Sequence, residues 1–440
     1  MSLGRAIQLQ NGFYDAGALI WLSVTFACLL AALVPARGAG GRSRRYRALP
    51  VIVLALGLIW QFATLISSRP AMYIEFEHPS DEPTFFRMLI AAATLSIGVL
   101  LGRRRPRQVA FLLVLVLHFA LGAWMLRASP KPRIDVVTVH REAIDALGHG
   151  RSPYSITFEN IYGHERFYAA GLTAGGRVLF GLPYPPLSLL MAAPGHWLAG
   201  DYRYALLAAL TSSGALIAFC GWRRRGEDAA ILERQACLAA LLLLFTPRVF
   251  FELEQGWTEP FAVLLLAATV FAAAGESRLS GPIAGLLVAV KQYLVLSVPL
   301  LFLLFGRHFT WRQAGIAVAT ATAVTLPFFL WDPAGFLNSV VLLQFAEPFR
   351  RDSLSYLSWM VRNGFDPPGV WITIVAACAA IALGMWRLPR TPAGFAAAVA
   401  LVTMASFAFG KKAFCNYYFL VIAALVIAVG AAADDRSPDP

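Results

Sequence analysis

Long apolar runs limit what this chain can fold into more than any other feature of its sequence. A helix crosses a bilayer with about 17 to 25 consecutive apolar residues, and runs near that length recur along the chain. Hydrophobic residues make up 58% of the 440 residues and charged residues only 14%, whereas a soluble domain is roughly a quarter charged. The sequence therefore predicts an all-α fold, a polytopic bundle of membrane helices.

We expect about 12 to 14 spans from the lengths of these runs. The candidate runs are 15–36, 49–67, 86–102, 107–126, 183–199, 204–222, 235–251, 259–275, 282–305, 312–330, 369–387, 394–409 and 415–433. The first run follows a polar stretch and lacks a short apolar core with a cleavage site, so we interpret it as a span rather than a signal peptide.

The net charge of +12 reflects arginines in short loops. Loops 37–47, 102–107 and 222–228 hold these clusters, and such loops normally face the cytoplasm. Anionic lipid headgroups are then the expected partner, not nucleic acid. We therefore expect a multi-pass protein of the cell inner (plasma) membrane. The five cysteines lie in or beside apolar runs without metal-ligand spacing, which favours buried thiols over disulfides or a metal site.

Two topologies remain open. If 183–199 is a full span, the basic loop 222–228 falls outside, against the charge rule. If 183–199 is re-entrant, that loop returns inside, and run 282–305 must split at Lys291. Both topologies place segments 127–182, 331–368 and 410–418 on the external side.

The external segment 127–182 is long and charged, and it begins with Asp135 just after a span. The apolar residues Val136, Val139, Ala143 and Leu147 follow at helical spacing, with His140, Arg141, Glu142 and Asp145 on the other faces. This pattern predicts an amphipathic helix lying in the membrane interface. The glycines and the proline of "GHGRSPY" end it.

Several cations lie on the same side as Asp135. Lys291 stands inside an apolar run, where an ionisable group is costly and suggests function. The others occur in "EPFRRDSLSYLSW" (347–359) and "GKKAFCNYYF" (410–419). A carboxylate can deprotonate an attacking hydroxyl, and cations can stabilise a departing phosphate. A phosphate leaving group at membrane depth implies a lipid tail, so this pattern favours sugar transfer from a polyprenyl phosphate.

Three motifs resemble the GT-C superfamily of membrane glycosyltransferases. They are Asp135, then "AIDALGHGRSPY" (143–154), then "YPP" (184–186). The closest resemblance is to glycosyltransferase family 87, whose members depend on polyprenyl-phosphate-mannose. "VKQYLVLSVPLLF" is similar to the KQ-containing segment of lipid-phosphate-sugar glucosyltransferases, and "FRRDSLSY" resembles an external loop of the superfamily. The resemblance extends loosely over 127–420.

The resemblance implies a GT-C-like bundle whose site is built by external loops, and inversion at the anomeric carbon. It implies Asp135 as the catalytic carboxylate, with Lys291 and Arg350 or Arg351 near the donor phosphate. We expect eight further residues to bind substrate: Tyr154, Tyr184, Gln292, Glu254, Glu259, Asp352, Lys411 and Lys412. A hexose is expected, with mannose favoured, and the acceptor is a glycan, a glycolipid or a protein. No cofactor is expected, and no metal, because His140, His149 and His164 lack ligand spacing.

Three spans precede the one that leads to Asp135, whereas the family usually begins with that span. We therefore divide the chain into N-terminal spans (1–126), the external loop (127–182), the main bundle with external loop 331–368 (183–433) and a cytoplasmic tail (434–440).

Other interpretations remain. Asp135 could serve as a helix N-cap, and Lys291 could extend its ammonium to the interface. A transporter or flippase for a lipid-linked or anionic substrate would also carry charges inside the membrane, although we find no internal repeat of the kind transporters show. A third possibility is a scaffold subunit without enzymatic activity.

Overall fold

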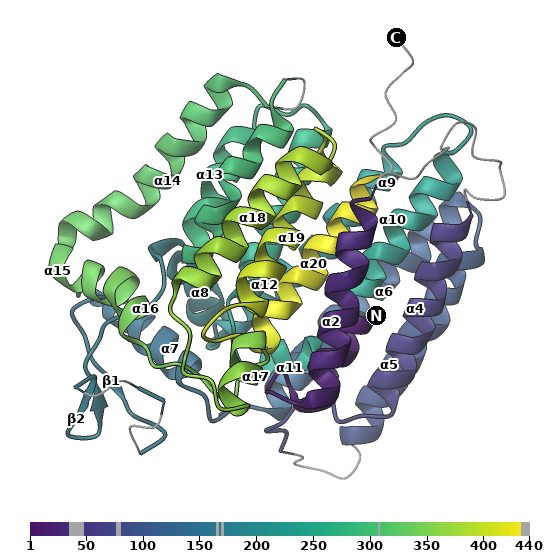
Figure 1. Cartoon of the computed structure of the whole chain (residues 1–440). Coiled ribbons are helices and arrows are strands. Elements are labelled where there is room, and N and C mark those ends of the chain that lie inside the picture. The colour runs from purple at the N-terminus through teal and green to yellow at the C-terminus, as the bar shows by residue number, and fades with distance from the viewer. Residues whose placement is uncertain (35–47, 76–80, 164–166, 169–170, 307–308, 433–440) are drawn as a thin grey trace.

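The structure is a computed structural model that describes residues 1–34, 48–75, 81–163, 167–168, 171–306 and 309–432. It is almost entirely helical, apart from one small sheet (Figure 1). Three features singled out in the sequence, the arginine loop 37–47, His164 and the tail 434–440, lie wholly or mostly outside the described residues.

Within the described residues before the sheet, six helices are present. They are α1 (Ser2–Gln10), α2 (Ala16–Ala32), α4 (Leu49–Ile66), α5 (Asp81–Leu101), α6 (Arg104–Ala128) and α7 (Asp135–Gly148). The sheet has the strand order β1-β3-β2, all antiparallel. Its strands are β1 (Phe158–Glu159), β2 (Thr173–Ala174) and β3 (Arg177–Val178).

The rest of the described chain is helical. The α-helices are α8 (Pro186–Ala199), α9 (Arg203–Trp222), α10 (Ala229–Leu244), α11 (Val249–Glu254), α12 (Glu259–Ala274), α13 (Ser280–Val290), α14 (Trp311–Trp331), α15 (Pro333–Phe336), α16 (Leu343–Ala346), α17 (Tyr356–Arg362), α18 (Trp371–Arg387), α19 (Pro392–Ala408) and α20 (Cys415–Ala431). Two 3₁₀ segments, η1 (Gln292–Ser297) and η2 (Pro299–Leu304), and a π-helical segment, η3 (Leu337–Leu342), complete the order.

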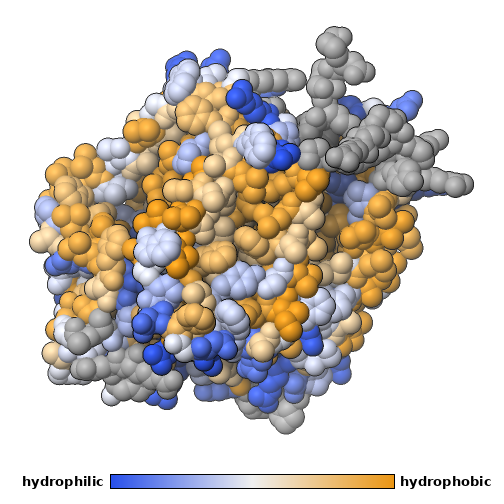
Figure 2. All heavy atoms as spheres, in the orientation of Figure 1, coloured by the Kyte–Doolittle hydropathy of each residue, from blue (hydrophilic) through white to orange (hydrophobic). Residues whose placement is uncertain are grey.

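The fold is that of a polytopic membrane protein, as the sequence predicts. Among the described residues, α4, α6, α9, α14 and the segment Glu82–Leu101 of α5 are long and apolar enough to cross a membrane, and shorter apolar helices accompany them. The hydrophobic surface forms a broad band, with hydrophilic residues gathered along the lower edge and at the top (Figure 2). Such a band matches a surface covered by lipid rather than water.

The two ends of the bundle differ in their residues. We call one end the arginine end, because it holds Arg104 and the loop that follows Trp222. A hydrogen bond from Arg104 Nη2 to the Trp222 carbonyl joins these segments at 3.1 Å. The opposite end, which we call the α7 end, carries α7, α11, α17 and the sheet, at the bottom of Figure 1.

The structure favours the re-entrant topology. Helix α8 begins after two prolines, ends at Gly200 with φ 74°, and packs along α7 and α9. His196 near its end contacts Asp145 of α7 at 3.0 Å, so α8 stays near the α7 end. Helix α13 stops at Lys291, and the chain returns through η1 and η2, which is the predicted split of 282–305. Loop 222–228 therefore lies at the arginine end.

Helix α7 matches the predicted amphipathic helix. It begins at Asp135, ends at Gly148, and buries Val136, Val139 and Ala143. Gly150 follows with φ 68°, a conformation that glycine adopts without strain. The placement of His140 on a polar face was wrong, because that side chain is fully buried between aromatic rings.

Backbone hydrogen bonds tie the loops of the α7 end together. The N–H of Arg350 donates to the Lys411 carbonyl at 3.0 Å, and that of Leu354 donates to the Ala413 carbonyl at 2.9 Å. The N–H of Tyr14, just before α2, donates to the Asp352 carbonyl at 2.8 Å. Three segments that are far apart in sequence therefore form one surface.

Candidate active site

Asp135 lies at the first position of α7, and two tyrosines hold its carboxylate. Tyr168 donates to Oδ2 at 3.1 Å, and Tyr162 donates to Oδ1 at 3.4 Å. The N-cap position belongs to Ile134, whose side chain makes no capping bond. The Asp135 carboxylate is therefore bound by side chains of the loop that follows α7.

The electrostatic surroundings of Asp135 act in both directions. Burial raises the pKa of its carboxyl above the ordinary value, whereas the hydrogen bond from Tyr168 lowers that pKa. Glu347 raises the pKa further and Lys412 lowers it. A carboxyl with a raised pKa is a better general base near neutral pH. The effects of Glu347 and Lys412 also show that both charges lie near Asp135.

His140 and Tyr184 stand beside Asp135. The His140 ring lies between Tyr184 at 4.9 Å and Tyr202 at 5.0 Å, and its Nδ1 donates to the Val136 carbonyl at 3.0 Å. Burial lowers the pKa of His140 to about 4, so the ring is neutral. Burial raises the pKa of Tyr184, and the charges of Asp135 and Glu259 raise it further. Two carboxylates, those of Asp135 and Glu259, therefore act on the Tyr184 hydroxyl.

Lys291 forms a buried ion pair at the break between α13 and η1. Its Nζ donates to Glu259 Oε1 at 2.8 Å, and Lys291 is only 4% exposed. The same oxygen accepts hydrogen bonds from Tyr293 at 3.1 Å and Asn416 at 2.9 Å. The ammonium also lies 4.9 Å from the centre of the Tyr184 ring. Tyr184 thus links the Lys291 pair to Asp135.

Arg350 lies at the loop surface on the other side of the site. It pairs with Asp352 through two parallel hydrogen bonds, of 2.9 and 2.8 Å. Its guanidinium lies 4.7 Å from the ring centre of Phe167 and 4.8 Å from that of Phe414. Because Phe167 directly precedes Tyr168, which binds Asp135, these contacts connect Arg350 to the candidate base. Its neighbour Arg351 is exposed.

Two lysines hold the loop between α16 and α17. Lys411 Nζ donates to the Glu347 carbonyl at 2.7 Å, and Lys412 pairs with the Glu347 carboxylate. Burial lowers the pKa of Lys411. Burial alone would also lower the pKa of Lys412, but Tyr417 and Glu347 outweigh it, and the pKa is raised. Lys412 therefore stays charged near Asp135.

The remaining sequence candidates make supporting contacts. Tyr154 is buried, and its hydroxyl donates to the Tyr184 carbonyl at 3.0 Å. Gln292 donates to the Pro183 carbonyl at 2.7 Å. Glu254 accepts from the N–H groups of Met72 and Tyr73, both at 2.7 Å. These residues fix the loops around the site, while Asp135, Tyr184, Glu259, Lys291 and Lys412 form its centre.

The family model of glycosyltransferase family 87 matches residues 182–410, which is more than half of the chain. The chain belongs to glycosyltransferase family 87. The matched part holds Glu259, Lys291 and Arg350, whereas Asp135 precedes it and Lys412 follows it. No curated protein matches the chain, and no solved structure does. The protein is thus a membrane glycosyltransferase.

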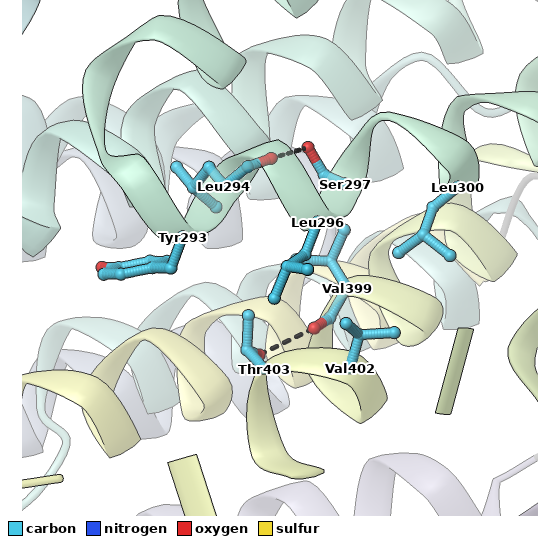
Figure 3. A pocket seen from close by; sticks show the side chains of 8 residues that line it. All are labelled: Tyr293, Leu294, Leu296, Ser297, Leu300, Val399, Val402 and Thr403. Carbon is cyan, nitrogen blue, oxygen red and sulfur yellow. Dashed lines mark hydrogen bonds between the residues drawn. The ribbon is translucent and has the colours of Figure 1, made fainter. Parts of the chain in front are cut away.

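A small apolar hollow of this glycosyltransferase lies between η1 and α19 (Figure 3). It is too narrow to admit a water molecule, and its lining includes Leu296, Val399 and Val402. The hydroxyls on its wall, of Ser297 and Thr403, donate to carbonyls of their own helical segments and leave the wall apolar. Tyr293, which also lines it, connects the hollow to Glu259.

Four residues of the candidate site in this family 87 glycosyltransferase, Tyr162, Tyr168, Glu347 and Tyr417, were not expected from the sequence. Tyr162 and Tyr168 lie in a loop without periodicity, so only the fold brings them to Asp135. In the sequence, Glu347 lies three residues before Arg350 and Tyr417 lies five residues after Lys412, and this proximity to residues already singled out was the available signal. Within the described ranges, no three His, Cys, Asp or Glu side chains gather closely enough to hold a metal ion.

Proposed function

We propose that this glycosyltransferase moves a hexose, with mannose favoured, from a polyprenyl-phosphate donor to a hydroxyl of a glycan, glycolipid or protein acceptor. One observation carries the proposal. A carboxylate with a raised pKa, Asp135, shares one end of a membrane bundle with the cations Lys291, Arg350 and Lys412. An acid next to cations at membrane depth suits a lipid-linked phosphate donor.

In the proposed reaction, Asp135 accepts the proton of the acceptor hydroxyl. The acceptor oxygen forms a bond to the anomeric carbon while the bond from that carbon to the phosphate oxygen breaks. The electron pair of the broken bond leaves with the polyprenyl phosphate, whose growing negative charge Lys291 and Arg350 stabilise. A single displacement of this kind inverts the anomeric carbon. Lys411 and Lys412 would contact the outer phosphate or the acceptor, whereas Arg351 is exposed and would face solvent or lipid headgroups.

The substrate-binding roles follow from position. Tyr184, Glu259 and Asp352 lie between or beside the charged groups, where they would bind sugar hydroxyls. Tyr154, Gln292 and Glu254 would keep the surrounding loops in register.

We further propose that the α7 end faces the outside of the inner (plasma) membrane. Arginines of loops 102–107 and 222–228 lie at the opposite end, and basic loops normally remain in the cytoplasm. The spans of 1–126 pack against the matched region through α4 on α10 and α6 on α9. We propose that the spans of 1–126 support the loop that carries Asp135. In the same orientation, the tail 434–440 is cytoplasmic.

The test is transfer of labelled sugar from a defined polyprenyl-phosphate donor by purified protein in lipid nanodiscs. We expect Asp135→Asn to lower the rate by about 10²- to 10⁴-fold, because a general base contributes about that much. Asp145→Asn is the matched control, since Asp145 is an exposed acid of the same helix. An Asp135→Asn protein that folds and transfers at the normal rate would contradict the proposal.

A further inference from the structure

Glu252 on α11 has no hydrogen-bond partner in the described part of the chain. The side chain is 0% exposed, and both carboxylate oxygens are buried and unpaired. Buried polar groups are nearly always hydrogen-bonded. An ionised carboxylate that is neither hydrogen-bonded nor paired is among the most costly groups to bury. The neutral, protonated acid is the form that this position tolerates.

The neighbouring acid has the opposite environment. Glu259 Oε1 accepts hydrogen bonds from Lys291, Tyr293 and Asn416, at 2.8, 3.1 and 2.9 Å. Three donors on one oxygen stabilise the ionised form. Burial raises the pKa of Glu252, the charge of Glu259 raises it further, and Lys291, which is paired with Glu259, lowers it. The single positive charge of Lys291 therefore neutralises Glu259. Among the described residues, Glu252 is the acid of the two that receives no hydrogen bond.

Titratable or charged groups lie on the elements around Glu252. They are Glu259 of α12, Lys291 after α13, Tyr293 of η1 and Cys415 of α20, with His118 of α6 stacked on Phe250 of α11 and Arg203 of α9 bonded to the carbonyl of Glu254. Among these, Lys291 is the only cation that acts on the Glu252 carboxyl directly.

We propose that Glu252 carries a proton in the resting enzyme and thereby keeps the cluster of Lys291, Glu259 and Glu252 free of net negative charge, so that Lys291 can attract the donor phosphate. This inference rests on the proposed role of Lys291. When Glu252 ionises, its O–H bond breaks, the proton goes to solvent, and the cluster gains one negative charge. That charge repels the donor phosphate. Glu252 is a positioning residue, because it acts through Lys291.

The first experiment detects the proton without measuring activity. Infrared spectra of the full-length protein in nanodiscs at neutral pH would report the carbonyl band of protonated carboxylic acids. We expect this band in the wild type, and we expect its intensity to decrease in Glu252→Gln. Glu233→Gln is the burial-matched control, because Glu233 is 1% exposed but bound by arginines, so the band persists there. Equal band intensity in the wild type and Glu252→Gln overturns the proposal.

The second experiment measures the effect on donor binding. Burial and the charge of Glu259 raise the pKa of Glu252, so the carboxyl ionises at a higher pH than an ordinary glutamate does. In the wild type we expect the KM for a polyprenyl-phosphate sugar to rise about tenfold or more above that pH, with kcat little changed. In Glu252→Gln, which mimics the neutral acid, this rise disappears.

The outcomes separate the two proposals. An alkaline rise in KM that persists unchanged in Glu252→Gln overturns the role of Glu252, and so does a wild-type KM that stays flat with pH. If Glu252→Gln fails to fold, the wild-type profile still decides. If no polyprenyl-phosphate sugar is used by the wild type, the proposed function fails, while the infrared result still reports the proton on Glu252.

Discussion

Two buried glutamates at opposite ends of the bundle have contrasting surroundings. Glu233 at the arginine end is 1% exposed and contacts Arg104 at 3.1 Å and Arg107 at 3.4 Å. Gln108 lies 3.4 Å away as a further donor. Glu252 at the α7 end is equally buried, but neither of its oxygens has a partner among the described residues. The two acids share chemistry and burial and differ in every polar contact.

The difference suggests separate roles for the two acids. A buried acid paired with arginines fixes two helices and leaves no charge available for a substrate. Buried carboxylates without partners lower stability, and proteins retain such groups mainly where function uses them. The α7 end keeps Glu252 unpaired and a carboxylate with a raised pKa at Asp135. We infer that the Glu233 pair is structural and that the α7 end is catalytic.

The largest effect is expected at the arginine end. Glu233→Leu leaves Arg107, which is 2% exposed, without its carboxylate partner. Removing one partner of a buried pair costs about 3–5 kcal/mol, so the free energy of unfolding should fall by about that amount in a denaturant titration in detergent. Transfer per folded molecule should stay the same. A large loss of transfer by folded protein would contradict the structural role of this end.

Lys291→Met should leave the protein folded and lower its transfer activity. Glu259 can take up a proton once the lysine is gone, so we expect the protein to fold. The loss of a cation near the donor phosphate should lower kcat/KM by about 10²- to 10³-fold. Lys131→Met is the control, because Lys131 is an exposed lysine of the loop before α7. If Lys291→Met and Lys131→Met had similar kinetics, Lys291 would have no role in donor binding.

A smaller change is expected for Tyr168→Phe. The hydrogen bond from Tyr168 lowers the pKa of Asp135, so its loss raises that pKa. Because the base works only when ionised, the acidic limb of the kcat/KM profile should move to higher pH. The rate should fall about threefold to tenfold, which corresponds to one hydrogen bond. Tyr162→Phe, which removes the longer 3.4 Å contact, should shift the limb less. A shift to lower pH would disprove the assignment.

Arg351→Ala should have the smallest effect. Its side chain is exposed, whereas the neighbouring Arg350 is paired with Asp352 and lies between two phenylalanine rings. Exposed substitutions usually change stability by less than about 0.5 kcal/mol. Transfer rates of Arg351→Ala and the wild type, measured side by side, should agree within about twofold. A strong loss would instead make Arg351 the donor-phosphate ligand.

The sequence predicted the fold more fully than the contacts within the site. Apolar run lengths indicated the membrane bundle, and the spacing of Val136, Val139 and Ala143 predicted α7. The break at Lys291 followed from combining charge with run length. All of these are local patterns, which periodicity can read.

Periodicity could not predict which residues contact the charged side chains. Glu259 and Asn416 meet Lys291 from distant helices, and Tyr168 reaches Asp135 from an aperiodic loop. His140 is i+4 from Val136 and i−3 from Ala143, so helical spacing places it on the buried face. Its polar side chain was the reason for grouping it with the charged residues, yet Tyr184 and Tyr202 cover it. Such pairings depend on how helices cross, and a single sequence does not specify the crossing.

The hydrogen bonds from Met72 and Tyr73 to Glu254 limit which chimeras of this protein can fold. The Glu254 carboxylate holds two consecutive backbone N–H groups at Met72 and Tyr73, which any amino acid other than proline could supply. A chimera can therefore exchange the side chains of this loop freely. A chimera that removes the segment containing Met72 and Tyr73 would take these two donors away from the buried Glu254 carboxylate.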